Sequence, residues 1–276
     1  MPGMLYLVPT TIGNLSDISV RCRETLEQAD FIAAEDTRVS LKLLNHLGIK
    51  KSLVSYYEHN KAFKGNVIVD RILAGETCAL VSDAGSPAIS DPGEDLVKQC
   101  AEAGITVCAI PGPCAAITAL SISGQATGRF TFEGFLSTAK KSRREHLESL
   151  LNEQRTMIFY EAPHKLLTTL EDMAAAFGPD RPISLCRELT KLHEEVIRTT
   201  LGGAVDLYTQ QPPKGEFVLV LAGAEPKVQE AATPEDAAKR VAALMEGGMS
   251  RKDAIKQAAQ ELNLPKNVVY DAALEI

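Results

Sequence analysis

The sequence lacks the short motifs by which many proteins hold phosphate groups. Neither G-x-G-x-x-G nor G-x-x-x-x-G-K-[ST] occurs in its 276 residues, which argues against the usual dinucleotide-binding and P-loop nucleotide-binding classes. No apolar run approaches the roughly 20 residues that span a bilayer. The N-terminus also lacks the charged start and small-residue cleavage site of a secretory signal. We therefore expect a cytoplasmic protein without a membrane segment.

Metal-binding and disulfide patterns are also missing. None of the six cysteines is spaced as C-x-x-C, and the five histidines form no H-E-x-x-H motif. Several cysteines lie inside apolar runs. We expect buried free thiols rather than disulfides or zinc, and no metal site.

Acidic residues outnumber basic ones: the sequence has 29 Lys and Arg and 36 Asp and Glu, which gives a formal net charge of −7. The overall charge therefore does not predict a nucleic-acid partner. Any such partner would need a local basic patch.

The sequence instead shows a repeated alternation of short apolar runs and helical patterns. In the first 123 residues this alternation predicts a mainly parallel sheet with helices on both faces. After residue 124 strands become more frequent, which predicts a second α/β domain with a mixed sheet. A polar linker and three short helices follow. The expected architecture is two α/β domains plus a small helical tail, with domains at 1–123, 124–223 and 224–276.

Four segments at the ends of predicted strands carry unusual glycine, proline and polar residues. Ligands bind beyond the carboxyl ends of the strands in open parallel sheets, so we expect these segments to face one crevice. Little charge and many backbone groups suit a ligand such as S-adenosylmethionine, with Asp83 near a ribose hydroxyl or the sulfonium. The alternative is that the segments only make tight turns. They are PTTIGN (9–14), AAEDTR (33–38), SDAGSPAISDPG (82–93) and IPGPCAA (110–116).

Charged residues follow several strands and are candidates for catalysis. Glu35 and Asp36 could form a helix N-cap, or could hold and deprotonate a hydroxyl substrate together with Arg38. His59 lies in a polar cluster at another strand end, although a lone histidine is more often structural. Similar clusters occur at 160–165 and 186–191, where surface ion pairs are the alternative.

Two basic groups could form the local patch that a nucleic-acid partner would need. The first is the run at 140–144, where positive charge opposes the dipole of the predicted helix and is easier to understand as a phosphate contact. The second lies on the tail, whose arrangement looks like a helix-turn-helix; a packing or dimer element is the alternative there. The candidates are Lys140, Lys141, Arg143, Arg144, Arg251, Lys252, Lys256 and Lys266.

Taken together, the motifs resemble the ribosomal RNA small subunit methyltransferase I family within the tetrapyrrole methylase superfamily. The matching stretches include LYLVPTTIGNLSDIS, FIAAEDTR, SYYEHN, LVSDAGSPAISDPG, PGPCAAITALSISG, FEGFL, FYEAPHKL and CRELTK. The family's first loop usually reads PTPIGN, whereas Thr11 replaces the second proline here.

The resemblance implies two α/β domains with S-adenosylmethionine in the cleft between them, and a homodimer. It also implies 2′-O-methylation of a cytidine in small-subunit (16S) ribosomal RNA, either naked or within the assembled subunit. The cofactor residues that it implies are Pro9, Asp83, Ser86, Pro87, Cys114, Ala115, Glu161 and Ala162.

For catalysis, this interpretation places four residues around the reacting hydroxyl and two more as outer candidates. Glu35 or Asp36 would be the base, and Arg38 would hold a phosphate. Three other functions stay open: a methyltransferase for a tetrapyrrole precursor, a non-catalytic ribosome-assembly factor, and a nucleotide-binding switch protein. The six candidates are Glu35, Asp36, Arg38, His59, Arg187 and Glu188.

Overall fold

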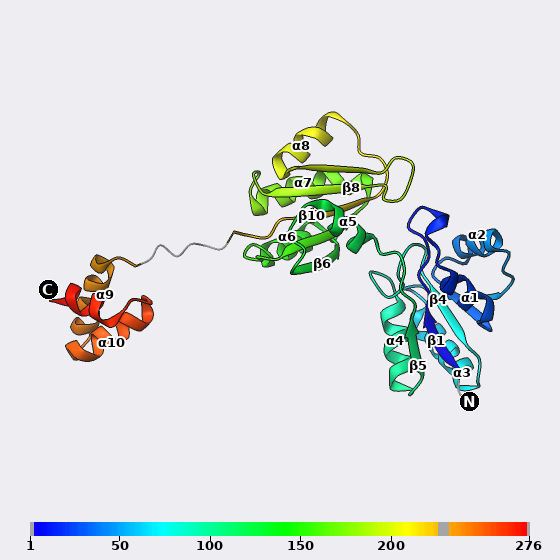
Figure 1. The fold of residues 1–276 in the computed structure, drawn as a ribbon, viewed down its shortest axis with the longest axis horizontal. Helices are drawn as coiled ribbons and strands as arrows, with labels where there is room; N and C mark the ends of the chain where they lie inside the picture. The colour runs from blue at the N-terminus through cyan, green and yellow to red at the C-terminus, as the bar shows by residue number, and fades with distance from the viewer. Residues whose placement is uncertain (1–2, 226–231, 275–276) are drawn as a thin grey trace. The chain divides into compact units, whose positions relative to one another are not determined.

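The computed structural model describes residues 3–225 and 232–274 (Figure 1). The chain divides into two compact units, with the boundary in the sequence between Ala224 and Glu225. Among the described residues, no helix has both the length and the apolar character needed to cross a membrane.

The first sheet of the larger unit has five parallel strands in the order β3-β2-β4-β1-β5. Its central strands are buried on both faces, which is why β2 and β4 read as continuous apolar runs without polar alternation. The predicted parallel sheet is confirmed. The strands are β1 (Met4–Leu7), β2 (Phe31–Ala34), β3 (Ser52–Ser55), β4 (Cys78–Val81) and β5 (Thr106–Ala109).

Helices cover both faces of this sheet. Along β2, Phe31 and Ala33 belong to the core beneath α3 and α4, whereas Ile32 and Ala34 belong to the core beneath α1 and α2. The helices are α1 (Val20–Gln28), α2 (Thr37–Leu47), α3 (Lys61–Leu73) and α4 (Gly93–Glu102).

The strand order creates a switch point between the neighbouring strands β1 and β4. The chain leaves β1 toward α1 on one face and leaves β4 toward α4 on the opposite face. The loops that follow these strands therefore diverge at the carboxyl edge. A crevice forms at such a point, and ligands of open α/β sheets bind there.

The second sheet is mixed, as predicted, with the order β6-β7-β10-β8-β9. Only β6 and β7 pair in parallel; the other three pairs are antiparallel. The strands are β6 (Phe130–Phe135), β7 (Thr156–Glu161), β8 (Pro182–Arg187), β9 (Glu195–Thr200) and β10 (Phe217–Leu221).

One helix ends at the predicted boundary at residue 123. Helix α5 (Ala115–Ser123) packs Ala116, Ala119 and Leu120 against Ile158 and Val220 of the second sheet. This packing favours a boundary at the Pro-Gly-Pro segment before the helix. The opposite face of the second sheet is covered by α6 (Lys140–Ser149), α7 (Pro163–Phe177) and α8 (Leu201–Gln210).

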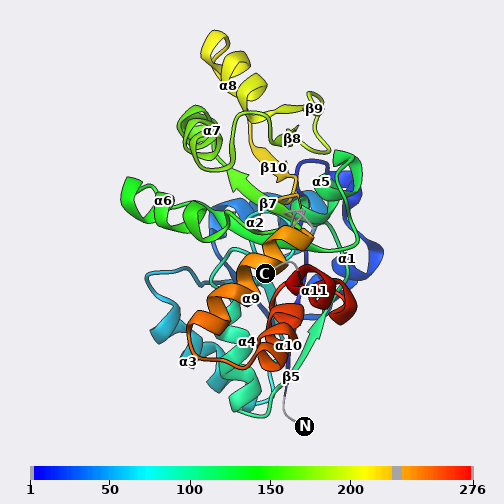
Figure 2. The same ribbon diagram turned by 90° about the vertical axis from the view of Figure 1, so that its left-hand side faces the viewer.

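The smaller unit contains three short helices that gather around one apolar centre (Figure 2). Thr233 forms a capping box with Asp236 at the start of α9, and Ser250 caps α10 through the backbone of Asp253. Most of the predicted linker, residues 226–231, lies outside the described residues. The helices are α9 (Pro234–Glu246), α10 (Arg251–Glu261) and α11 (Lys266–Ala273).

Candidate active site

A cavity of about 350 Å³ lies at the switch point, and both sheets contribute to its wall. This volume is at the lower end of the range for small-molecule pockets, about 300–1,000 Å³. All four segments singled out in the sequence reach it, which confirms that they share one crevice. Each segment places at least one residue in the cavity wall, for example Ile12, Glu35, Asp83 and Cys114 in chain order.

Direct hydrogen bonds hold these loops together. The backbone amide of Thr10 donates to the carbonyl of Gly85 at 2.9 Å, and the Ser86 hydroxyl donates to the carbonyl of Pro113 at 2.9 Å. A Cβ added at Gly112 would lie 2.6 Å from Cβ of Pro9, so only glycine fits there. Three of the loops are therefore linked directly to one another at the wall.

Backbone strain is concentrated in two of the cavity's loops. Five non-glycine residues in the described ranges have a φ between +50° and +67°, and four of them are Ala88, Ser90, Glu188 and Thr190. Such conformations persist only where the surroundings enforce them. In the first loop, Asp91 supplies the constraint by accepting from the amides of Ala88 and Gly93 at 2.8 and 2.9 Å.

The two adjacent carboxylates of the AAEDTR segment have different surroundings. Asp36 is the N-cap of α2, and its carboxylate also binds the guanidinium of Arg38 at 2.6 Å. Arg38 thereby lowers the pKa of Asp36 to about 2. Asp36 is consequently a weak base, and neither it nor Arg38 lines the cavity.

Glu35, by contrast, lines the cavity and has an elevated pKa. Burial is the main cause, followed by repulsion from Asp83 and Asp91. Partial burial also raises the pKa of Asp83, which accepts a hydrogen bond from the amide of Asp36 at 3.0 Å. Of the two carboxylates that the sequence left as alternatives, Glu35 has the better position and basicity to accept a proton.

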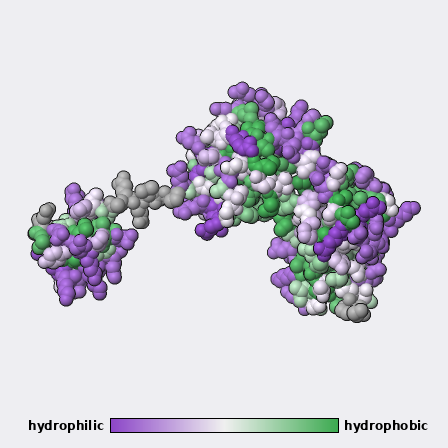
Figure 3. All heavy atoms as spheres, viewed as in Figure 1, coloured by the Kyte–Doolittle hydropathy of each residue, from purple (hydrophilic) through white to green (hydrophobic). Residues whose placement is uncertain are grey.

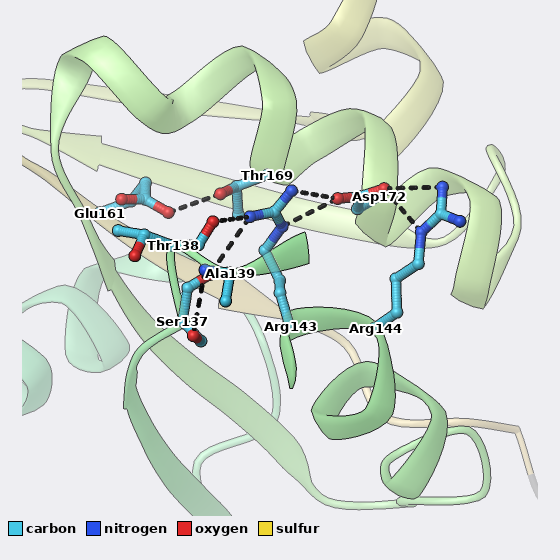
Figure 4. A network of polar contacts seen from close by, with 8 residues as sticks. All are labelled: Ser137, Thr138, Ala139, Arg143, Arg144, Glu161, Thr169 and Asp172. Atoms are coloured by element: carbon cyan, nitrogen blue, oxygen red, sulfur yellow. Dashed lines mark hydrogen bonds and ion pairs between the residues drawn. The ribbon is translucent and has the colours of Figure 1, made fainter. Parts of the chain in front are cut away.

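The second sheet supplies aromatic and small residues. The Tyr160 hydroxyl accepts from the amide of Ala116 at 3.1 Å, and burial raises its pKa to about 12. Glu161 is only 3% exposed, and its carboxylate accepts from the hydroxyl of Thr169 at 2.6 Å (Figure 4). The carboxylate also accepts from the amide of Ala162 at 2.9 Å. Glu161 is thus fixed at the end of β7 by α7.

The CRELTK segment forms an ion-pair network at the cavity edge. Lys191 Nζ lies 2.8 Å from the Glu188 carboxylate and 2.9 Å from that of Glu216. The bond from Lys191 lowers the pKa of Glu188. Arg187 pairs with Glu195 at 3.1 Å and does not line the cavity. These contacts tie the charged side chains of the segment to one another, and the outer catalytic role of Arg187 and Glu188 stays a prediction.

His59 does not join the site. It is exposed in the turn after β3, an edge strand of the first sheet, and its ring packs edge-on near Tyr57. Two residues implied by the resemblance also lie off the cavity wall, since Pro9 is buried against Gly112 and Pro87 is buried in its loop. The other six implied cofactor residues line the wall.

The sequence interpretation missed several wall residues. Phe135 lies in the FEGFL motif and Tyr160 in the FYEAPHKL motif, but the sequence interpretation gives neither residue a binding or catalytic role. Lys191 was part of a noted cluster, but Glu216 reaches the site only through the pairing of β8 with β10. Strand alternation could have identified Tyr160, whereas nothing in the local sequence marks Glu216.

Arg143 is a correction to the predicted RNA-contacting run. Its side chain is only 9% exposed, pairs with Asp172 at 2.7 Å, and donates to the carbonyls of Ser137 and Thr138 at 3.2 Å (Figure 4). Its donors are used within the fold, joining α6 to α7. Lys140, Lys141 and Arg144 remain exposed.

The basic residues of the tail fall into two groups. Lys239 and Arg240 pair with Glu235 and Glu261. The candidates Lys252, Lys256 and Lys266 are exposed and form no ion pair with any residue in the described ranges, while Arg251 donates to the carbonyl of Ala273. Figure 3 shows many hydrophilic side chains on the visible face of this unit.

Solved structures share the fold of the larger unit. Diphthine synthase covers 80% of this chain and 90% of its own with a TM-score of 0.61 at 15% identity. Uroporphyrin-III C-methyltransferase from Thermus thermophilus, in complex with S-adenosylhomocysteine, covers 80% and 97% with a TM-score of 0.57 at 15% identity. At these identities the likeness shows the fold alone.

Two family models match the chain. Residues 4–205 match the tetrapyrrole (corrin/porphyrin) methylases, and residues 231–276 match the RsmI C-terminal helix-turn-helix domain.

Full-length relatives carry one common name, ribosomal RNA small subunit methyltransferase I. The protein from Synechocystis sp. is 48% identical and is covered over 98% of its length, with 99% of this chain aligned. Those from Bacillus subtilis and Escherichia coli O157:H7 are 46% and 45% identical, with 98% and 99% of this chain and 94% and 95% of theirs aligned. With its tetrapyrrole-methylase unit followed by the matching helical domain, this chain belongs to the ribosomal RNA small subunit methyltransferase I family.

Proposed function

We propose that this protein transfers a methyl group from S-adenosylmethionine to the ribose 2′-hydroxyl of a cytidine in small-subunit (16S) ribosomal RNA. The observation that carries the proposal is Glu35, a carboxylate of raised pKa in the wall of the switch-point cavity. A ribose hydroxyl is a weak nucleophile near neutral pH and needs a base beside it. Family membership supplies the substrate class.

The cavity suits the cofactor in size and in chemistry. Its wall includes Cys114 and Ala115 at the start of α5. The Cys114 side chain does not cap this helix; the Ala116 amide donates to Tyr160, and the Ala115 amide is left as a donor for a polar ligand. Tyr160 and Phe135 offer aromatic surface, and Asp83 offers a carboxylate for a ribose hydroxyl or a positive sulfonium. When bound, S-adenosylmethionine supplies an activated methyl group.

The remaining chemistry falls to the chain itself. Glu35 accepts the proton of the ribose hydroxyl at its carboxylate. Asp83 holds the amide of Asp36 at 3.0 Å and so fixes the backbone beside Glu35. The interlocked loops position the two reactants, and positioning supplies much of the rate in an in-line displacement.

RNA contacts fit the exposed cations. Lys140, Lys141 and Arg144 on α6, together with Lys252, Lys256 and Lys266 of the tail, would neutralise phosphates despite the negative net charge. We further propose a homodimer as the working form. The same proposal places the protein in the cytoplasm and takes the assembled small subunit as the form that presents the target nucleotide.

The test is transfer of labelled methyl from S-adenosylmethionine to small ribosomal subunits that lack the modification, followed by mapping of ribose methylation. We expect a single 2′-O-methylcytidine. Free 16S RNA serves as the second substrate and shows whether the assembled subunit is needed.

Negative outcomes point to the other candidate functions. Cofactor binding without transfer to subunits or RNA would support an assembly factor. Transfer to a tetrapyrrole precursor would support a small-molecule methyltransferase, whereas a thermal shift with ATP or GTP in place of the cofactor would support a nucleotide switch.

A further inference from the structure

A second cavity of about 220 Å³ lies beside the first. It is enclosed by the loop after β1, by α2 and by the loop after β4. Ser82 and Asp83 line both cavities, so the loop after β4 forms a wall common to the two. We name this space the α2 cavity.

Ser40 adds a polar group to the α2 cavity, whose wall is otherwise mostly apolar and includes Leu15, Val39 and Leu43. The residue is only 4% exposed, and its hydroxyl finds no hydrogen-bond partner among the described residues. Buried hydroxyls are nearly always paired, and one that is not calls for an explanation such as a missing ligand. Thr10 is equally buried and already donates to the carbonyl of Ser82 at 3.2 Å, which leaves its oxygen free to accept.

The size of the cavity restricts the ligand. It is clearly smaller than the 350 Å³ space proposed for the cofactor, and it falls below the usual range for drug-sized ligands. A single polar ring fits these limits. A pyrimidine base has donors and acceptors along its edge that hydroxyls such as those of Ser40 and Thr10 can meet.

Helix α2 also carries a row of basic residues past this cavity. Arg38, Lys42 and His46 are spaced by four residues and so lie on one face of the helix. All three are exposed, and Lys42 and His46 line the cavity. Such a row suits the phosphates that flank one nucleotide in an RNA strand.

We infer that the α2 cavity receives the base of the target nucleotide, a pyrimidine turned out of its RNA stack. The ribose then lies toward Asp83 and Glu35, and the flanking phosphates lie along α2. Enzymes that act on one nucleotide of a structured nucleic acid commonly extrude it in this way. The inference rests on the proposed RNA methyltransferase function.

Ser40→Ala tests the inference, because it removes a single oxygen that has no partner in the fold. We expect unchanged or slightly higher thermal stability and unchanged affinity for S-adenosylmethionine. The kcat/KM for methylation of small subunits should fall about fivefold, as expected for one lost hydrogen bond. Lys42→Met should lower kcat/KM as well, and should flatten its dependence on salt.

The matched control is Thr131→Val, which removes another buried hydroxyl without a described partner, on β6 and outside both cavities. It should leave kcat/KM unchanged. If Ser40→Ala and Lys42→Met both methylate subunits as well as the unmodified protein does, the α2 cavity does not bind the substrate. If the unmodified protein itself methylates neither subunits nor RNA, the proposed function fails, and this inference fails with it.

Discussion

The AAEDTR and CRELTK segments follow the same sequence pattern and acquire opposite properties. Each continues a buried strand into an acid with a cation three residues later, Glu35 with Arg38 and Glu188 with Lys191. Arg38 turns back to the neighbouring Asp36, while burial, followed by repulsion from Asp83 and Asp91, raises the pKa of Glu35. Lys191 instead binds Glu188 itself, whose pKa is lowered.

The difference shows that backbone geometry decides the chemistry of such motifs. In the first segment a helix starts at once, and Asp36 becomes its N-cap within reach of Arg38. In the second, Glu188 and Thr190 adopt positive φ values and make a tight turn that brings Lys191 onto Glu188. We therefore expect substitutions in the first segment to affect the reaction and those in the second to affect stability.

The largest expected effect is the loss of catalysis in Glu35→Gln. Removal of a general base lowers rates about 10²- to 10⁴-fold, while cofactor affinity and folding should be retained. The measurement is single-turnover methyl transfer to small subunits, with calorimetric titration of S-adenosylmethionine in parallel. Asp36→Asn is the control, because it keeps an N-cap and lies outside the cavity, and it should reduce the rate far less. A folded Glu35→Gln variant with full activity would mean that another group accepts the proton.

A smaller effect is expected in the second segment, where Lys191→Met leaves two carboxylates without their cation. Because Glu188 is mostly buried and Glu216 mostly exposed, we expect a loss of about 1–2 kcal/mol. For a unit of this size that corresponds to a melting temperature about 2–8 °C lower. Thermal unfolding followed by circular dichroism measures it. Lys214→Met, at an exposed lysine nearby, should not change the melting temperature; equal shifts in both variants would contradict the structural role.

The smallest effect is a difference in pH dependence between Glu35 and Asp36. Folding raises the pKa of Glu35 above its ordinary value of 4.5. The free energy of unfolding therefore falls on account of this residue as the pH rises above 4.5. Glu35→Gln should therefore be stabilising at pH 7, and this gain should shrink toward pH 4.

Asp36 should show the opposite sign. Its pKa is lowered from 3.8 to about 2, so its contribution is present above pH 3.8 and is lost as pH falls toward 2. Asp36→Asn should be destabilising at pH 7 and neutral near pH 2. Urea unfolding at several pH values compares the two, and parallel curves for both variants would show that the carboxylates do not differ.

Local patterns were enough to predict most of the fold. The order of the strands and helices follows from the alternation of short apolar runs with helical patterns. Where these elements end follows from the positions of glycine and proline, which are properties of neighbouring residues. The convergence of four loops also followed, because parallel strands place their carboxyl ends at one edge. The face covered by α5 could not be predicted, since this helix is rich in small apolar residues and its sequence does not indicate which sheet it contacts.

Side-chain roles were less predictable, because they depend on partners far away in the chain. Arg143 resembles an RNA contact until Asp172, 29 residues later, is found beside it. The ion-pair network of Lys191 similarly includes Glu216, which lies 25 residues later in the chain. Such pairs are set by helix packing and strand pairing, and no local pattern reports them.

The strained turns at Ala88, Ser90, Glu188 and Thr190 have a consequence for protein engineering. Replacing such residues by glycine, or searching broadly for more thermostable variants, would relax these turns and loosen the walls of the cavity. A higher melting temperature obtained there would come with a lower rate of methyl transfer. Stabilising substitutions are better sought far from these turns, for example on the outward faces of α3 and α8.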